Sequence, residues 1–192
     1  MSHGTESRAA PAERRSPGLA ALFDALAEDG RHSILDLGAA SGAHLRLLGA
    51  FAQQVRFAGV LAGAGRDGAW DDALRALPPN PARPYDVVLA WDVLDRLDAD
   101  GRSALVARLA EVTAPRARLY AIAAGEGAAG AGGLAFTLLG RDRVAERPAA
   151  VTDVATRPLL PAQMERVLIP FEVVSAFMLR SGAREYVAMK RP

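Results

Sequence analysis

Residues 34–42 read Ile-Leu-Asp-Leu-Gly-Ala-Ala-Ser-Gly, and this stretch decides the fold. The apolar run from His32 to Leu37 predicts a buried strand, and Ser41-Gly42 predicts the start of a helix. The small residues between them let a ligand approach the backbone, and the start of the helix points free N–H groups towards it. A turn of this kind, at the carboxyl end of a strand in an open parallel sheet, is where α/β proteins bind ligands.

Strands and helices alternate on both sides of this turn, which implies a parallel sheet with right-handed crossovers. We expect helices at 17–29, 42–51, 67–77, 100–113 and 161–168, and strands at 32–37, 55–61, 85–91, 118–124, 171–179 and 183–190. The last two strands form a hairpin at Ser181-Gly182. The predicted fold is Rossmann-like, a doubly wound and mostly parallel sheet in three α/β/α layers with an antiparallel C-terminal hairpin. The glycine-rich segment 125–133 is expected to be flexible, and 134–158 shows no readable pattern.

Length and composition indicate a globular protein of one domain. The chain has 192 residues, of which 51% are hydrophobic and 23% charged, and this length suffices for a single core. We expect a disordered tail at residues 1–15, which lack periodicity, and a single domain at 16–192. Lys190 is the sole lysine, and this arginine bias is typical of a GC-rich, bacterial-type genome rather than of phosphate binding.

Composition also argues against several kinds of partner. The net charge of +1 provides no field that would attract nucleic acid or an anionic membrane. The chain has no cysteine, and its three histidines (His3, His32 and His44) are scattered, so we expect neither disulfides nor a metal centre. No apolar run resembles a signal peptide or a membrane span, which predicts a cytoplasmic protein.

The glycine spacing separates this turn from the common nucleotide motifs. A G-x-G-x-x-G fingerprint would need a glycine at Ala40, and the chain has no G-x-x-x-x-G-K-[ST] sequence. Asp36, just before the first glycine, disfavours a pyrophosphate and favours a cationic or hydroxyl-rich ligand. A nicotinamide oxidoreductase is therefore disfavoured.

Residues 34–42 resemble the glycine-rich turn of class I S-adenosylmethionine-dependent methyltransferases. Residues 86–97 (DVVLAWDVLDRL) resemble that family's fourth strand and the stretch after it, 118–124 resembles the fifth strand, and 171–191 resembles the terminal hairpin. These stretches stand in the family's order and, taken together, span most of the chain from about residue 17. The resemblance implies S-adenosylmethionine as the cofactor and a backbone cradle for its methionine part at the turn.

The resemblance also assigns residues to the cofactor. They are Asp36, Gly38, Ala39, Ala40, Gly42, Leu61, Asp72, Ala73, Trp91 and Asp92. Asp36 would orient the turn or the cofactor's amino group, and Trp91 and Asp92 would face the cofactor and the acceptor. Methyl transfer depends mainly on positioning, although some acceptors need a general base, for which His44 and Asp92 are the candidates.

Two features depart from the family. Leu61 stands where the family usually has an acidic residue that binds both ribose hydroxyls, and losing such bonds costs about 1.5–3 kcal/mol each. Asp67 or Asp71 could compensate. The segment 62–84 is too short for the family's usual helix and third strand, so that strand is missing or reduced to Ala82-Arg83.

Each candidate also has a purely structural interpretation. Asp36 could cap the turn, His44 could be a surface or capping group, and Trp91 could belong to the core. Asp92 and Asp95 could simply begin a helix, where acidic residues favour the dipole.

Two functions follow from these alternatives. One is methyl transfer from S-adenosylmethionine to a small-molecule acceptor. The other is a catalytically inactive binding or scaffolding module with the same fold. The sequence leaves a homo-oligomer open.

Overall fold

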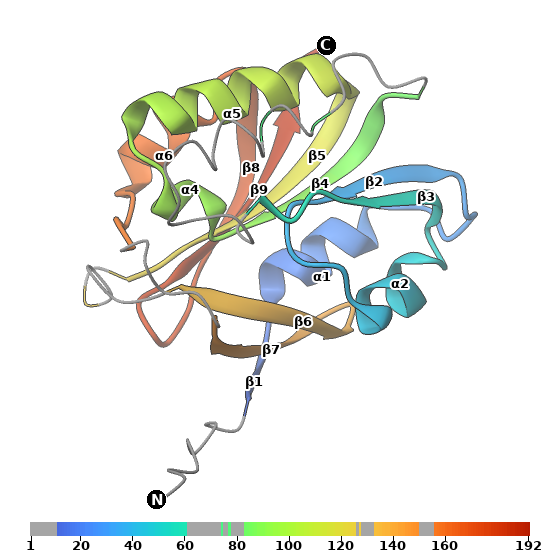
Figure 1. Ribbon diagram of the computed structural model, residues 1–192, viewed down its shortest axis with the longest axis horizontal. Coiled ribbons are helices and arrows are strands. Elements are labelled where there is room, and N and C mark those ends of the chain that lie inside the picture. Colours follow the sequence, from blue (N-terminus) through green and yellow to red (C-terminus); the bar gives the residue numbers. More distant parts are fainter. Residues whose placement is uncertain are drawn as a thin grey trace, which may run out of the picture.

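The computed structural model describes residues 11–60, 74, 77, 83–125, 127, 133–149 and 156–192. Its centre is a six-stranded sheet in the order β3-β2-β4-β5-β9-β8 (Figure 1). The strands are β2 (His32–Asp36), β3 (Ala52–Phe57), β4 (Tyr85–Trp91), β5 (Thr113–Ala123), β8 (Phe171–Met178) and β9 (Arg184–Lys190). The first four are mutually parallel, whereas β9 is antiparallel to both β5 and β8. The predicted parallel sheet with a C-terminal hairpin is confirmed.

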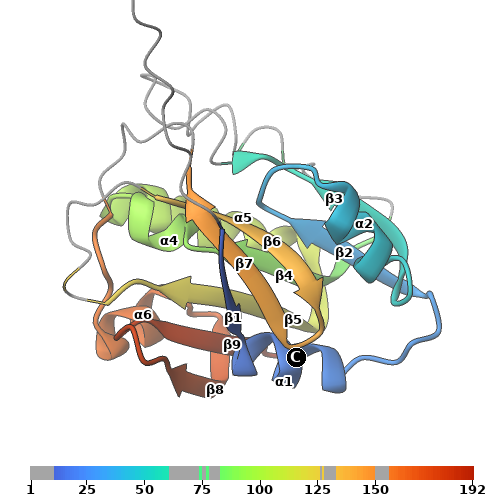
Figure 2. The same cartoon turned by 90° about the horizontal axis from the view of Figure 1, so that it is seen from below.

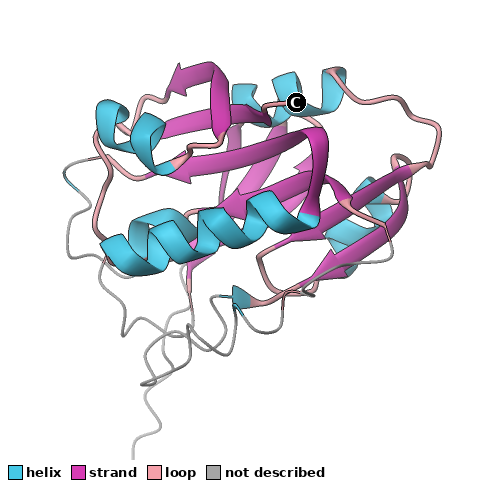
Figure 3. Ribbon diagram, turned by 90° about the horizontal axis from the view of Figure 1, so that it is seen from above, coloured by secondary structure: helices cyan, strands magenta, loops and turns pink. Residues whose placement is uncertain are grey.

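Helices cover both faces of this sheet. α1 (Pro17–Asp24) and α2 (Gly42–Leu48) lie on one face, and α4 (Val93–Arg96), α5 (Ala99–Val112) and α6 (Pro161–Val167) lie on the other (Figures 1 and 3). The predicted N-caps are present, since Ser16 and Ser41 accept hydrogen bonds from the backbone N–H groups of Leu19 and Ala43. Each face has its own apolar core against the sheet. The predicted three-layer α/β/α arrangement is therefore confirmed.

A second, smaller sheet was not predicted. β1 (Ala12–Arg15), β7 (Arg143–Pro148) and β6 (Leu134–Gly140) form an antiparallel sheet in the order β1-β7-β6, which lies across the α1 and α2 side of the molecule (Figure 2). The prediction of disorder at 1–15 is wrong for residues 12–15, because their backbone pairs with β7. Residues 1–10 lie outside the described part of the chain.

A buried carboxylate fastens β1 and α1 to the main sheet. Glu185 on β9 is 0% exposed. It accepts hydrogen bonds from four donors, namely Arg14 Nη1 at 2.5 Å, Ser16 Oγ at 2.7 Å, Tyr120 Oη at 2.9 Å and Gly18 N at 2.8 Å. A buried charge is tolerated only when it is paired and hydrogen-bonded in this way. This network explains why the polar sequence Ala-Glu-Arg-Arg at 12–15 forms a strand.

The strand after the glycine turn begins and ends earlier than predicted. β3 spans Ala52–Phe57 rather than 55–61, and Gly59 then adopts a left-handed φ of +55°. The backbone N–H groups of Gly59 and Val60 donate to the carbonyls of Gly38 and Leu37, so the chain turns across the end of β2. Between β3 and β4 the described residues contain no strand, and the predicted helix at 67–77 lies outside them except for Leu74 and Leu77.

Candidate ligand site at the glycine turn

The glycine turn lies where the order of the strands reverses. β2 pairs with β3 on one side and with β4 on the other, so its carboxyl end opens a crevice of the kind in which α/β proteins bind ligands. The turn runs from Asp36, the last residue of β2, to Gly42, the first residue of α2. Its position is the one predicted from the sequence.

Asp36 organises this turn from beneath. Its carboxylate is 0% exposed. Oδ1 accepts hydrogen bonds from Gly38 N at 2.8 Å and Trp91 Nε1 at 2.7 Å, and Oδ2 lies 2.7 Å from His44 Nδ1. Three N–H groups therefore satisfy a side chain that cannot be hydrated. The turn-orienting role is the one these contacts support, and the side chain has no exposed surface for a ligand.

His44 lies in the first turn of α2 and is also buried, with 1% exposure. Because a carboxylate only accepts hydrogen bonds, the Asp36 contact places a proton on Nδ1. Nε2 is buried and has no hydrogen-bond partner among the described residues. The ring lies between Phe57 and Trp91, at centroid distances of 6.3 and 5.5 Å. The surface position considered for His44 is therefore wrong.

Trp91 covers the glycine turn at Gly38, which we call the inner half of the turn. Its φ of +51° is left-handed, which is rare for a bulky residue and turns the indole back over the end of β2. A Cβ placed on Gly38 would lie 3.1 Å from Trp91 Nε1, so the indole rests directly on the glycine. Phe136 of β6 stacks on the indole with a centroid distance of 5.1 Å and an interplanar angle of 10°. Trp91 is 1% exposed and belongs to the core.

The outer half of the turn remains open. Ala39, Ala40 and Gly42 are exposed, whereas Gly38 is half-buried. A Cβ on Gly42 would meet only the Arg46 side chain, at 3.7 Å. Small, exposed residues beside the end of a strand leave the backbone accessible to a ligand.

The Asp92 carboxylate is paired with Arg96 and is not open to a ligand. Its Oδ2 accepts hydrogen bonds from Arg96 Nε at 3.0 Å, Arg96 Nη2 at 2.8 Å and Leu134 N at 3.3 Å. Burial raises the pKa of Asp92, and the Arg96 guanidinium opposes that shift. Oδ1 is buried without a partner among the residues that the structure describes. The pair joins α4 to the start of β6, since Arg96 Nη2 also donates to the Leu134 carbonyl at 3.0 Å.

Some predicted site residues cannot be placed. Leu61, Asp72 and Ala73 lie outside the described residues. Within the described ranges, no group of three or more His, Cys, Asp or Glu side chains could hold a metal ion. No helix in those ranges is long and apolar enough to span a membrane.

The sequence did not point to Phe136 as a member of the site. It belongs to β6, in the stretch 134–158 that showed no readable pattern. The available signal was the Gly140-Arg141-Asp142 sequence, a turn pattern that follows the apolar stretch 134–139.

Comparison with known proteins supports the fold. No family model matches the chain, and no curated protein matches it in sequence. Many solved structures do match, among them a methyltransferase dependent on S-adenosylmethionine from Mesorhizobium loti, with a TM-score of 0.55 and 13% identity over 88% of this chain and 96% of that one. The N-methyltransferase NodS from Bradyrhizobium japonicum matches with a TM-score of 0.52 and 12% identity over 91% and 94% of the two chains.

A TehB-like methyltransferase dependent on S-adenosylmethionine from Corynebacterium glutamicum matches similarly, with a TM-score of 0.51 and 18% identity over 91% and 88%. At these identities the similarity establishes the fold. The chain has the Rossmann-like α/β fold found in these methyltransferases, which the sequence resemblance predicted.

Proposed function

We propose that the protein transfers a methyl group from S-adenosylmethionine to a small-molecule acceptor. The observation that carries the proposal is the turn at residues 36–42. In a fold shared with methyltransferases, it presents Ala39, Ala40 and Gly42 as exposed small residues at the strand-order switch. A ligand needs such residues to approach the backbone.

The outer half of the turn fits the cofactor, and the inner half fits it only without Trp91. Ala39, Ala40 and Gly42 would hold the cofactor along the exposed backbone. Asp36 would act through the turn, because its three hydrogen bonds already occupy both carboxylate oxygens. The cofactor would supply a sulfonium methyl group that is intrinsically reactive towards nucleophiles. The contribution of the chain is then to position the reactants, which is where most of the acceleration of such a displacement arises.

A specific observation favours a second function. The Trp91 indole rests on Gly38 and donates to Asp36, so it fills the position where the resemblance places the cofactor's methionine part. In this alternative the protein is a catalytically inactive module with the methyltransferase fold.

Calorimetric titration with S-adenosylmethionine and S-adenosylhomocysteine tests the proposal. We expect micromolar binding by the native protein. Gly42→Leu should weaken it about tenfold or more, because position 42 has room for a side chain that then blocks the exposed backbone. Ala50→Leu, at an exposed position just beyond α2, is the matched control and should bind normally. Absence of binding at millimolar ligand would refute the proposal and favour the inactive module.

A further inference from the structure

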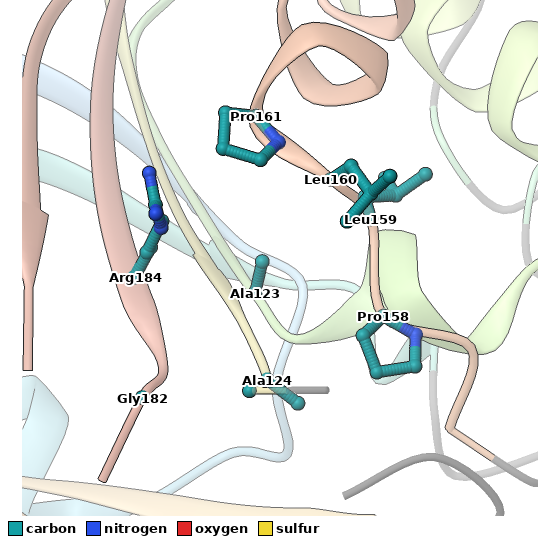
Figure 4. Close-up of a pocket in the computed structure, with 9 residues that line it drawn as sticks. Ala123, Ala124, Pro158, Leu159, Leu160, Pro161, Gly182 and Arg184 are labelled. Carbon is teal, nitrogen blue, oxygen red and sulfur yellow. The ribbon is translucent and has the colours of Figure 1, made fainter. Parts of the chain in front are cut away.

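A pocket of about 300 Å³ opens where β5 ends (Figure 4). Ala123 and Ala124 form its floor, the segment 158–161 that leads into α6 forms one wall, and Arg184 at the start of β9 forms the other. The volume lies at the lower end of the range for small-molecule sites. It therefore suits a small ligand.

The pocket lies on the same edge of the sheet as the glycine turn, with β4 between the strands that lead to them. β4 and β5 are neighbouring strands, and Trp91 pairs with Ala121. With strands about 4.8 Å apart and a rise of about 3.3 Å per residue, the Cα atoms of Trp91 and Ala123 are about 8 Å apart. A molecule in the pocket and a ligand at the turn would thus be close neighbours.

Buried contacts hold the pocket open in advance of any ligand. The Asp95 carboxylate is 0% exposed and accepts hydrogen bonds from Ala124 N at 2.6 Å and Leu159 N at 3.2 Å, which fixes the floor to one wall. A Cβ on Gly125 would lie 3.0 Å from the Gly182 carbonyl carbon, so the end of β5 also contacts the β8–β9 turn directly. A pocket formed in this way loses little entropy when a ligand enters.

The charge of the pocket is that of one arginine. Arg184 is the only charged side chain among the residues that line it, and it forms no ion pair with a carboxylate of the described residues. The Asp95 carboxylate lies behind the wall and is already bound by two backbone N–H groups. The remaining side chains of the lining are alanines, prolines and leucines. A planar guanidinium at the side of an apolar pocket is suited to a carboxylate or phosphate on an apolar body.

We propose that this pocket binds a small molecule that carries one oxyanion group on an apolar body, with the oxyanion held by Arg184. That this molecule is the methyl acceptor rests on the function proposed above. The binding of the oxyanion does not rest on it.

Calorimetric titration of the full chain with benzoate, phenyl phosphate and neutral benzamide tests the proposal. We expect at least one of the two anions to bind about tenfold or more tightly than benzamide, and the tighter anion identifies the oxyanion. Arg184→Gln should abolish this preference, whereas Arg180→Gln, at an exposed position in the same hairpin, should retain it. Equal binding of anion and amide, or no binding of any probe at millimolar concentration, would overturn the proposal.

A second variant keeps the test valid if Arg184→Gln fails to fold. Leu160 lines the pocket opposite Arg184 and is 48% exposed, so Leu160→Glu adds a negative charge to the lining without opening a cavity. It should abolish anion binding, and unchanged anion binding would contradict the proposal. Titration of the native protein with S-adenosylmethionine and with the anions separates the two proposals. Cofactor binding by the native protein without anion binding refutes only the pocket, and anion binding without cofactor binding refutes only the methyl transfer. Arg184→Gln should still bind the cofactor, because the glycine turn is intact in this variant.

Discussion

Replacement of Trp91 tests whether its indole competes with a ligand for the inner half of the glycine turn. The indole holds this position through its 2.7 Å hydrogen bond to Asp36 and its stacking on Phe136. A ligand that reaches Gly38 and Asp36 must break both contacts. Removal of the indole should therefore raise the affinity for S-adenosylmethionine, whereas removal of a ligand-contacting residue would lower it.

The two contacts set the size of the effect. A hydrogen bond to a charged group contributes about 1.5–3 kcal/mol and a stacked aromatic pair about 0.5–1.5 kcal/mol. Breaking both thus costs about 2–4.5 kcal/mol, which lowers the apparent affinity by about 30-fold to 1600-fold. Trp91→Phe removes only the N–H donor and should gain about tenfold or more, and Trp91→Ala should gain further. Trp91→Ala should also cost about 3–5 kcal/mol of unfolding free energy, because it leaves a large cavity.

Calorimetric titration with S-adenosylmethionine and adenosine measures these gains. The resemblance places the methionine part of the cofactor at Gly38, so adenosine, which lacks it, should bind the variants and the native protein alike. Ala50→Leu, at an exposed position just beyond α2, is again the control and should bind like the native protein. Weaker cofactor binding by both Trp91→Phe and Trp91→Ala would refute the reasoning and make Trp91 a ligand contact.

The other predictions concern buried charge and close packing, and urea denaturation measures all of them. Glu185→Ala should lower the unfolding free energy by about 3–5 kcal/mol, because it leaves buried hydrogen-bond donors without their acceptor. Its control is Glu172→Ala, at a side chain 64% exposed, which should change the unfolding free energy by less than about 1 kcal/mol. Gly133→Ala would push a methyl group into the Arg96 guanidinium and should cost about 1–3 kcal/mol. Gly127→Ala, whose added methyl group meets no atom of the described residues within 4 Å, should not. Burial raises the pKa of Asp95 to about 6, so the folded state holds this proton more tightly than the unfolded state does. The stability of the native protein relative to Asp95→Asn should therefore fall by about 2.4 kcal/mol from pH 4 to pH 7, and a constant difference would contradict this pKa.

The elements that the sequence predicted are those in which local pattern and burial agree. β4 was predicted with its observed bounds, because its residues form an apolar run buried on both faces between β2 and β5. The hairpin of β8 and β9 was likewise predicted from two strand-like runs joined at Ser181-Gly182. The small sheet was missed because β1 is polar and mostly exposed, and β6 and β7 alternate only weakly. β1 also depends on pairing with β7, more than 100 positions away in sequence, which no local pattern reveals.

The part of the candidate site that the sequence predicted is likewise the part that a local pattern defines. Asp36, Gly38 and Gly42 belong to one contiguous motif, so their proximity follows from the chain itself. The contact of Trp91 with Gly38 could not be foreseen, because it depends on a left-handed φ at the end of β4. The pocket was missed because its lining comes from the end of β5, the segment before α6 and the start of β9, which only the folded sheet brings together.

The end of β4 connects the glycine turn to the small sheet. Trp91 contacts the turn through Gly38 and stacks on Phe136 of β6, while the next residue, Asp92, binds the start of β6 through Leu134 N. Two consecutive residues therefore hold β6 over the edge at which a ligand would enter. A ligand that displaced the indole would also have to release its contact with β6, so ligand binding at the turn would depend on residues some 100 positions away in sequence. A ligand at the glycine motif would therefore reach only as much of its backbone as Trp91 and the small sheet leave open.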